Sequence, residues 1–177
     1  MRILVHICCA PCFTYPHERL IGEGHDVTGF FFNPNIHPYS EYKKRMESLE
    51  KYAELKGTRI IYKNDYDIES YLRGALGSSD RCEFCYNMRL KETAIAAKSL
   101  GFDAFTTTLL ISPYQKHEVL ASAGKKIAGE YGIVFYYEDF RIGYGKSREM
   151  ARALDLYMQK YCGCIFSEKE RYLKKGK

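Results

Sequence analysis

The sequence of 177 residues lacks tryptophan and any long apolar run. A membrane-spanning helix needs about 20 consecutive apolar residues, and no segment approaches that length. The apolar stretch at the N-terminus is also shorter than the core of a secretory signal peptide. We therefore predict a protein without membrane association that works in the cytoplasm, where thiols stay reduced.

The sequence also lacks the features of a disulfide scaffold or a multidomain chain. It has seven cysteines, an odd number and too few for the disulfide framework of a small secreted protein. We find no internal repeat, low-complexity segment or linker in it. The length suits one hydrophobic core, so we predict a single domain over residues 1–177.

The net charge of +5 is modest and identifies no partner by itself. Basic residues gather at Lys43, Lys44 and Arg45, and again in a C-terminal tail. These groups either follow the phosphate backbone of a nucleic acid or form ordinary solvated surfaces. The tail consists of Arg171, Lys174, Lys175 and Lys177.

Apolar and β-branched runs alternate with helical patterns along the whole chain. The runs predict strands at 2–7, 26–32, 59–62, 104–110 and 133–137. Helices are expected between them, with Ser40 and Asp80 as caps, and at 112–130, 146–159 and 166–174. This order predicts an α/β fold: a Rossmann-like parallel sheet of about five strands, helices on both faces and a helical C-terminus. Ligands of such folds bind at the carboxyl ends of the strands.

The cysteines fall in three tight clusters, and this distribution is the strongest functional signal. The first cluster follows the first predicted strand and enters a helix, and the second opens another helix. Partial positive charge at a helix N-terminus favours thiolates, the form of cysteine that binds metals. The clusters are Cys8, Cys9 and Cys12; Cys82 and Cys85; and Cys162 and Cys164.

Three interpretations of the first two clusters remain open. Their five thiols exceed the four ligands that a four-iron cluster takes, so one thiol is left for another role. A zinc ion with four thiolates is the second interpretation, and reduced cysteines buried in the core are the third. Cys162 and Cys164 form either a redox-active dithiol, added metal ligands or a structural pair in a turn.

Four segments together resemble the QueH family of epoxyqueuosine reductases, and they span nearly the whole chain in the family's order. The resemblance implies an adenine-nucleotide-hydrolase-like, Rossmann-related sheet. Here CCAPC occupies the first strand-to-helix turn, where ATP-using relatives carry a phosphate-binding loop, which argues against ATP use. The segments are HICCAPC (6–12), RCEFCYNMRL (81–90), TTLLISPYQ (107–115) and YCGCIFS (161–167).

The resemblance implies the last step of queuosine synthesis in tRNA, at the wobble position of the anticodon loop. An epoxide loses its oxygen as water and becomes an alkene, which takes two electrons and two protons. The family is thought to use a [4Fe-4S] cluster with a nearby mononuclear iron, without cobalamin. A second metal with an open position can act as a Lewis acid on the epoxide oxygen. An external donor must supply the electrons.

The resemblance also implies roles for individual residues. Cys8, Cys9, Cys82 and Cys85 are expected to bind the cluster, and Cys12 joins them as a metal ligand. Cys162 and Cys164 are expected to be catalytic, completing the site or relaying electrons as a dithiol and disulfide. Substrate-binding residues are expected near the strand ends: Tyr86, Arg89 and Tyr114.

Rival functions come from other classes of protein. A zinc-stabilised RNA-binding module explains the cysteines and the charge without catalysis. A thiol–disulfide oxidoreductase uses Cys162 and Cys164 but has no need for the other thiols. A tRNA thiolase shares the fold, but the missing phosphate loop argues against it. Neither the electron donor nor the oligomeric state follows from the sequence.

Overall fold

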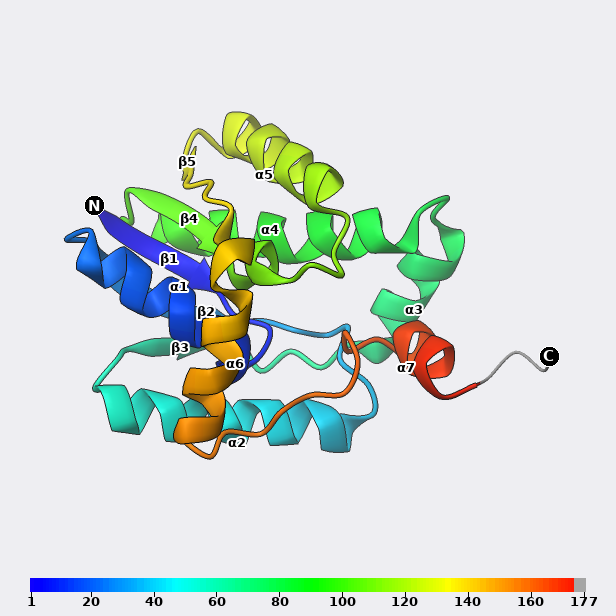
Figure 1. Cartoon of the computed structure of the whole chain (residues 1–177). Helices are drawn as coiled ribbons and strands as arrows, with labels where there is room; N and C mark the ends of the chain where they lie inside the picture. The colour runs from blue at the N-terminus through cyan, green and yellow to red at the C-terminus, as the bar shows by residue number, and fades with distance from the viewer. Residues whose placement is uncertain (174–177) are drawn as a thin grey trace.

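Five parallel strands form one sheet in the computed structural model of the chain, which describes residues 1–173 (Figure 1). The strand order is β3-β2-β1-β4-β5, so β1 lies at the centre. This arrangement confirms the predicted Rossmann-like parallel sheet. The strands are β1 (Arg2–His6), β2 (Asp26–Phe31), β3 (Ile60–Tyr62), β4 (Ala104–Thr107) and β5 (Val134–Phe135).

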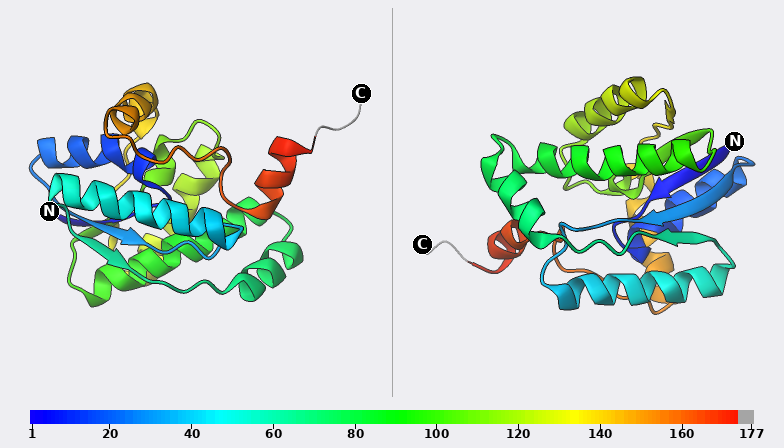
Figure 2. Two further views of the ribbon diagram at one scale, coloured as in Figure 1. Left: turned by 90° about the horizontal axis from the view of Figure 1, so that it is seen from below. Right: turned by 180° about the vertical axis from the view of Figure 1, so that it is seen from behind.

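Helices cover both faces of the sheet, which explains why the central strands are buried almost throughout (Figure 2). On one face, α1 packs against α2 and α6; on the other, α4 packs against α5 and against strands β1 and β4. No helix within residues 1–173 is both long and apolar enough to span a membrane. The helices are α1 (Ala10–Gly22), α2 (Tyr39–Lys56), α3 (Ile68–Gly77), α4 (Arg81–Ser99), α5 (His117–Tyr131), α6 (Tyr144–Ala153) and α7 (Ile165–Tyr172), with short 3-10 helices η1 (Thr108–Ile111) and η2 (Phe140–Gly143).

Capping residues fix where the helices begin. Asp80 caps α4 as predicted, because its carboxylate accepts hydrogen bonds from the backbone N–H groups of Cys82 and Glu83. Ser40 was expected to cap α2, and this is wrong: α2 starts at Tyr39, and its N-cap is Pro38. The cap fixes the start of α4, so that Cys82 lies in its first turn and Cys85 follows one turn later.

Two segments beyond the strands differ from the prediction. The strand expected at 104–110 ends at Thr107, whose hydroxyl accepts a hydrogen bond from the Leu109 N–H and turns the chain into η1. The helix expected at 112–130 consequently begins only at His117. The helix expected at 146–159 ends at Ala153, and Asp155 then adopts a left-handed conformation with φ of 48°. Residues 154–164 are therefore a loop.

The two strands at the centre of the sheet, β1 and β4, have crossovers that leave in opposite directions. Such a switch point is where α/β sheets bind ligands, at the carboxyl ends of the strands. Cys8 follows β1 at this edge, and Thr108 follows β4. Helices α3 and α7 lie beside each other beyond the same edge (Figures 1 and 2), where Cys164 and Phe166 pack onto a small core around Tyr71 and Cys85.

Candidate metal centre

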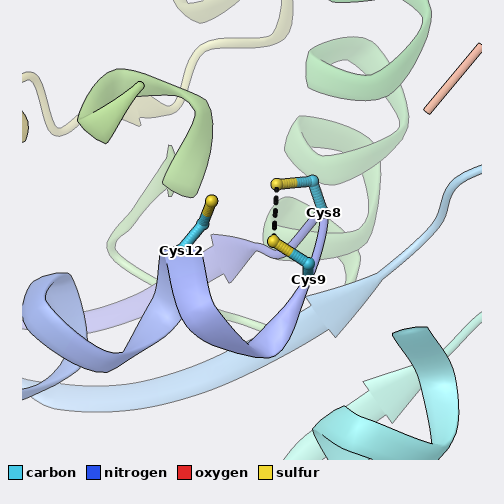
Figure 3. A group of neighbouring side chains, drawn as sticks. All are labelled: Cys8, Cys9 and Cys12. Carbon is cyan, nitrogen blue, oxygen red and sulfur yellow. Dashed lines mark hydrogen bonds between the residues drawn. The ribbon is translucent and has the colours of Figure 1, made fainter. Parts of the chain in front are cut away.

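Three cysteine thiols converge where β1 passes into α1. The Sγ atoms of Cys8, Cys9 and Cys12 all lie within 4.8 Å of one another, and those of Cys8 and Cys9 are 3.7 Å apart (Figure 3). The chain passes from strand to helix here: Cys9 has an extended backbone and is the N-cap of α1, and Cys12 lies in the first turn of that helix. All three side chains are buried, and their sulfur atoms are close enough together that the group could hold a metal ion.

Hydrogen bonds within this cysteine triad separate the acidities of the three thiols. Bonds from Cys12 and Cys9 lower the pKa of Cys8 well below its ordinary value, although burial opposes the shift. Burial raises the pKa of Cys9, and hydrogen bonding to Cys8 raises that of Cys12. The Thr108 hydroxyl also lies 3.5 Å from the Cys8 sulfur and 3.2 Å from its backbone nitrogen. Cys8 is therefore the thiol that most readily becomes a thiolate.

The C-x-x-C pair and the C-x-C pair lie near each other. Cys82 and Cys85 are three residues apart in α4 and so share one helix face. The pKa of Cys85 is raised to about 11, chiefly by burial; Arg89 opposes this shift, and nearby Cys162 and Cys164 add to it. Cys164 also packs in the same small core as Cys85. The fold thus brings the second and third cysteine clusters together.

Hydrogen bonds from the buried Arg45 side chain and from the His37 backbone hold the C-x-C segment in place. The Arg45 guanidinium donates to the carbonyl oxygens of Cys162 and Tyr161, at 2.9 and 3.0 Å. The His37 backbone N–H donates to the Gly163 carbonyl at 2.8 Å. Gly163 has a φ of 143°, and a Cβ there would lie 3.1 Å from the Cγ1 atom of Ile36. Only glycine fits this close approach without strain.

A cavity of about 710 Å³ opens over the triad. Cys8 and Cys12 of the triad and Cys162 of the C-x-C segment all line it. Gln159 donates to the Cys12 sulfur and Gln115 to the Cys162 sulfur, both at 3.5 Å. The other lining residues are Pro11, Thr108, Leu109, Ser112, Tyr114, Tyr144, Ser147, Arg148, Met158, Lys160, Tyr161 and Arg171, so the lining carries three cations and no carboxylate.

Comparison with known proteins decides the family. A family model described as "Epoxyqueuosine reductase QueH" matches residues 3–170. The epoxyqueuosine reductase QueH of Dehalococcoides mccartyi is 38% identical over 172 residues, which cover 97% of this chain and 94% of that protein. The QueH protein of Thermotoga maritima is 36% identical over 182 residues, which cover 96% of this chain and 91% of that one. The chain belongs to the QueH family. It is therefore an oxidoreductase, an epoxyqueuosine reductase.

A QueH protein of Helicobacter pylori is 37% identical, and the match covers 94% of this chain but 49% of that longer protein. Among solved structures, a deacetylase of the teicoplanin biosynthetic pathway aligns with a TM-score of 0.42 at 10% identity, over 75% of this chain and 61% of that chain. That likeness is too weak to bear on function, so the assignment to QueH depends on sequence.

The structure places the three expected substrate-binding residues in different surroundings. Tyr86 is buried, and its hydroxyl donates to the Gln115 side chain at 2.9 Å, so its ring is not available for stacking on a base. Arg89 is only 1% exposed and lies among thiols, not against the cavity. Tyr114 is 82% exposed, lines the cavity and packs edge-on against Tyr144, and its contact with substrate stays a prediction.

Residues of the two basic groups lie in different surroundings in the structure. Arg45 was grouped with Lys43 and Lys44 as a surface that could follow phosphates, and this is wrong for Arg45. Its side chain is 1% exposed and pairs with Glu41 at 2.8 Å inside the protein. Of the C-terminal tail, Arg171 lines the cavity. Lys174, Lys175 and Lys177 lie outside the described residues.

Three residues of this QueH site were missed in the sequence. Thr108, Gln115 and Gln159 each place a polar group on a cysteine sulfur. Thr108 and Gln115 lie within the TTLLISPYQ segment, so a signal existed there, although Thr108 falls inside the run 104–110 that predicts a strand. Gln159 lies in a loop where a helix was expected, and nothing in its sequence neighbourhood marks it.

The donor set fits a metal–thiolate centre. Thiolates are soft ligands that suit iron–sulfur clusters and zinc, and all seven cysteines are free thiols. Two buried cations, Arg45 and Arg89, lie close enough to these thiols for thiolate charge to raise the pKa of both. A site with buried cations suits an anionic group better than it suits neutral core cysteines.

Proposed function

We propose that the chain reduces epoxyqueuosine to queuosine within tRNA, at a [4Fe-4S] cluster and an additional iron held by its cysteines. The observation that carries this proposal is the gathering of thiols from three distant segments at one sheet edge, in a member of the QueH family. We place the protein in the cytoplasm, as a single domain, with an external electron donor.

We assign the cluster to Cys8, Cys9, Cys82 and Cys85, and Cys12 to the additional iron. Such a group, when bound, supplies electrons one at a time and a Lewis acid beside the substrate. The triad supports this assignment because its sulfurs already lie within 4.8 Å of one another. The α4 pair supports it because capping by Asp80 fixes the first helical turn.

We assign the electron relay to Cys162 and Cys164. Oxidation of two thiols to a disulfide releases two electrons and two protons, which is what the conversion of an epoxide to an alkene and water consumes. Cys162 lines the cavity, and Cys164 packs against the small core that contains Cys85. The external donor then reduces the disulfide again.

The cavity supports binding of an anticodon nucleotide. Its volume of about 710 Å³ can hold a modified base. The exposed ring of Tyr114 at its edge suits stacking on a neighbouring base. Arg148, Lys160 and Arg171 line it without any carboxylate beside them, which suits contacts to phosphates.

Removing cavity cations is expected to weaken tRNA binding. The double variant Arg148→Gln/Lys160→Gln deletes two charges of the lining, so the slope of log affinity against log salt should fall by about 1 per residue. The matched control Lys125→Gln/Lys126→Gln removes two exposed charges from α5. Equal salt slopes for the two double variants, measured by filter binding across a salt series, contradict this use of the cavity.

Visible absorption of anaerobically purified protein, with metal analysis of the same sample, tests the proposed cofactors. We expect a broad brown absorption that bleaches on reduction, with more iron per chain than one four-iron cluster accounts for. A colourless protein that binds only zinc removes the electron source. That result favours a zinc-stabilised RNA-binding module or a thiol–disulfide oxidoreductase.

A further inference from the structure

Arg89 is a buried cation whose charge has no partner in the described part of the chain. It lies on α4, one turn after Cys85, and is 1% exposed. Its Nε atom donates to the Cys85 carbonyl oxygen at 3.2 Å. Neither Nη1 nor Nη2 has a hydrogen-bond partner within residues 1–173. A buried charge without a partner is strongly destabilising, so something must offset it.

The neighbours of Arg89 indicate where an offsetting charge can form. Cys85, Cys162 and Cys8 lie close enough that negative charge on them raises the pKa of Arg89, although burial acts to lower it. Each of these cysteines comes from a different one of the three clusters. Arg89 is therefore a cation shared by all parts of the proposed metal centre.

Comparison with Arg45 shows that the lack of a partner is particular to Arg89 and does not follow from burial alone. Arg45 is equally buried, but Glu41 balances its charge at 2.8 Å and two carbonyl oxygens accept its Nη groups. Within residues 1–173, Arg89 has the same burial without a carboxylate partner or an acceptor for its Nη groups. The charge that would balance it there is that of an anionic group bound by the neighbouring cysteines.

We propose that Arg89 is the counter-charge of the metal–thiolate centre, a positioning residue that stabilises the bound anionic group and favours its reduced form. Thiolate-bound clusters carry net negative charge, which increases on reduction, and nearby positive charge raises their reduction potential. This inference depends on the proposed function, because it requires a thiolate-bound redox centre at this site.

The variant Arg89→Met replaces the arginine with an uncharged side chain of similar length. It is compared with the wild type in the metal-free and in the reconstituted protein. Metal-free Arg89→Met should melt above the metal-free wild type, by about 2–4 °C or more, because an unpaired buried charge is gone. The reconstituted variant should show at least a tenfold lower equilibrium constant for reduction, equal to 59 mV for one electron. Its cluster should also be lost at least about tenfold faster to a chelator.

Two further variants complete the test. Arg89→Lys keeps a positive charge, so most of the potential of the wild type should return. Arg152→Met removes an exposed arginine from α6 and should match the wild type in both measurements. Melting is followed by circular dichroism on metal-free protein, and the potential by an anaerobic spectroelectrochemical titration of reconstituted protein.

The outcomes distinguish this inference from the proposed function. A wild type that binds a redox-active cluster while Arg89→Met shows the same potential and the same chelator resistance overturns the role of Arg89 alone. Metal-free Arg89→Met that melts below the wild type also overturns it, because the arginine is then stabilised by the protein itself. A wild type that binds no cluster overturns both proposals.

Discussion

Cys8→Ala is expected to give a folded protein that has lost its metal centre and its reductase activity. Within the triad, Cys8 is the thiol that hydrogen bonding favours as a thiolate, and it also lines the cavity. Loss of one cluster ligand removes the electron source, so activity should fall at least about a thousandfold, or ~4 kcal/mol in activation free energy. Iron and sulfide per chain, the visible spectrum and turnover are measured on the same anaerobic sample.

A graded control accompanies this variant. Thr108→Val keeps every thiol but removes the hydroxyl beside Cys8, so we expect a loss of about 10–100-fold with the cluster retained. Cys82→Ala tests the α4 half of the centre in the same way as Cys8→Ala. Full iron content and full activity in either alanine variant show that the cysteine concerned is not a ligand.

Arg45→Met is expected to cost about 3–5 kcal/mol of unfolding free energy, the usual effect of breaking a buried ion pair. Among residues 1–173, the substitution leaves the buried Glu41 carboxylate with the Tyr157 hydroxyl as its one remaining side-chain partner. It also removes both hydrogen bonds to the carbonyl oxygens of Tyr161 and Cys162. The C-x-C segment should then lose its position over the cavity, and activity should fall with stability.

Equilibrium urea unfolding of metal-free protein measures this effect without a contribution from the cofactor. The double variant Glu41→Gln/Arg45→Met removes both charges and should lose clearly less stability than the sum of the two single variants. If Arg45→Met costs under about 1 kcal/mol, the arginine does not hold the C-x-C segment, and its burial has another cause.

Much of the fold could be predicted because strand and helix signals alternate regularly. The parallel sheet, its helical faces and the cap at Asp80 follow from local pattern. The path after β4 could not, because a threonine hydroxyl turns the chain inside a run rich in β-branched residues. The loop at 154–164 was likewise hidden within a helix-like pattern.

The cysteines could be found from spacing alone, whereas their surroundings could not. Arg45 is an instructive error, because it lies at helical spacing from Tyr42, Leu49 and Tyr52, the buried face of α2. Its positive charge predicts a surface residue, whereas its position in the helix predicts a buried one, and the position proved decisive. Gln159 shows the limit of sequence reasoning, since only the folded chain brings it to a cysteine 147 residues away.

Which cysteine binds which metal stays a prediction. One assay tests the proposed reaction most directly. Anaerobically reconstituted protein is incubated with tRNA that carries epoxyqueuosine and with a chemical reductant, and the nucleosides are then analysed by mass spectrometry. We predict conversion to queuosine, with the loss of one oxygen atom, by the iron-loaded protein and none by the metal-free protein. Unchanged tRNA with fully loaded protein, or equal conversion by metal-free protein, contradicts the account.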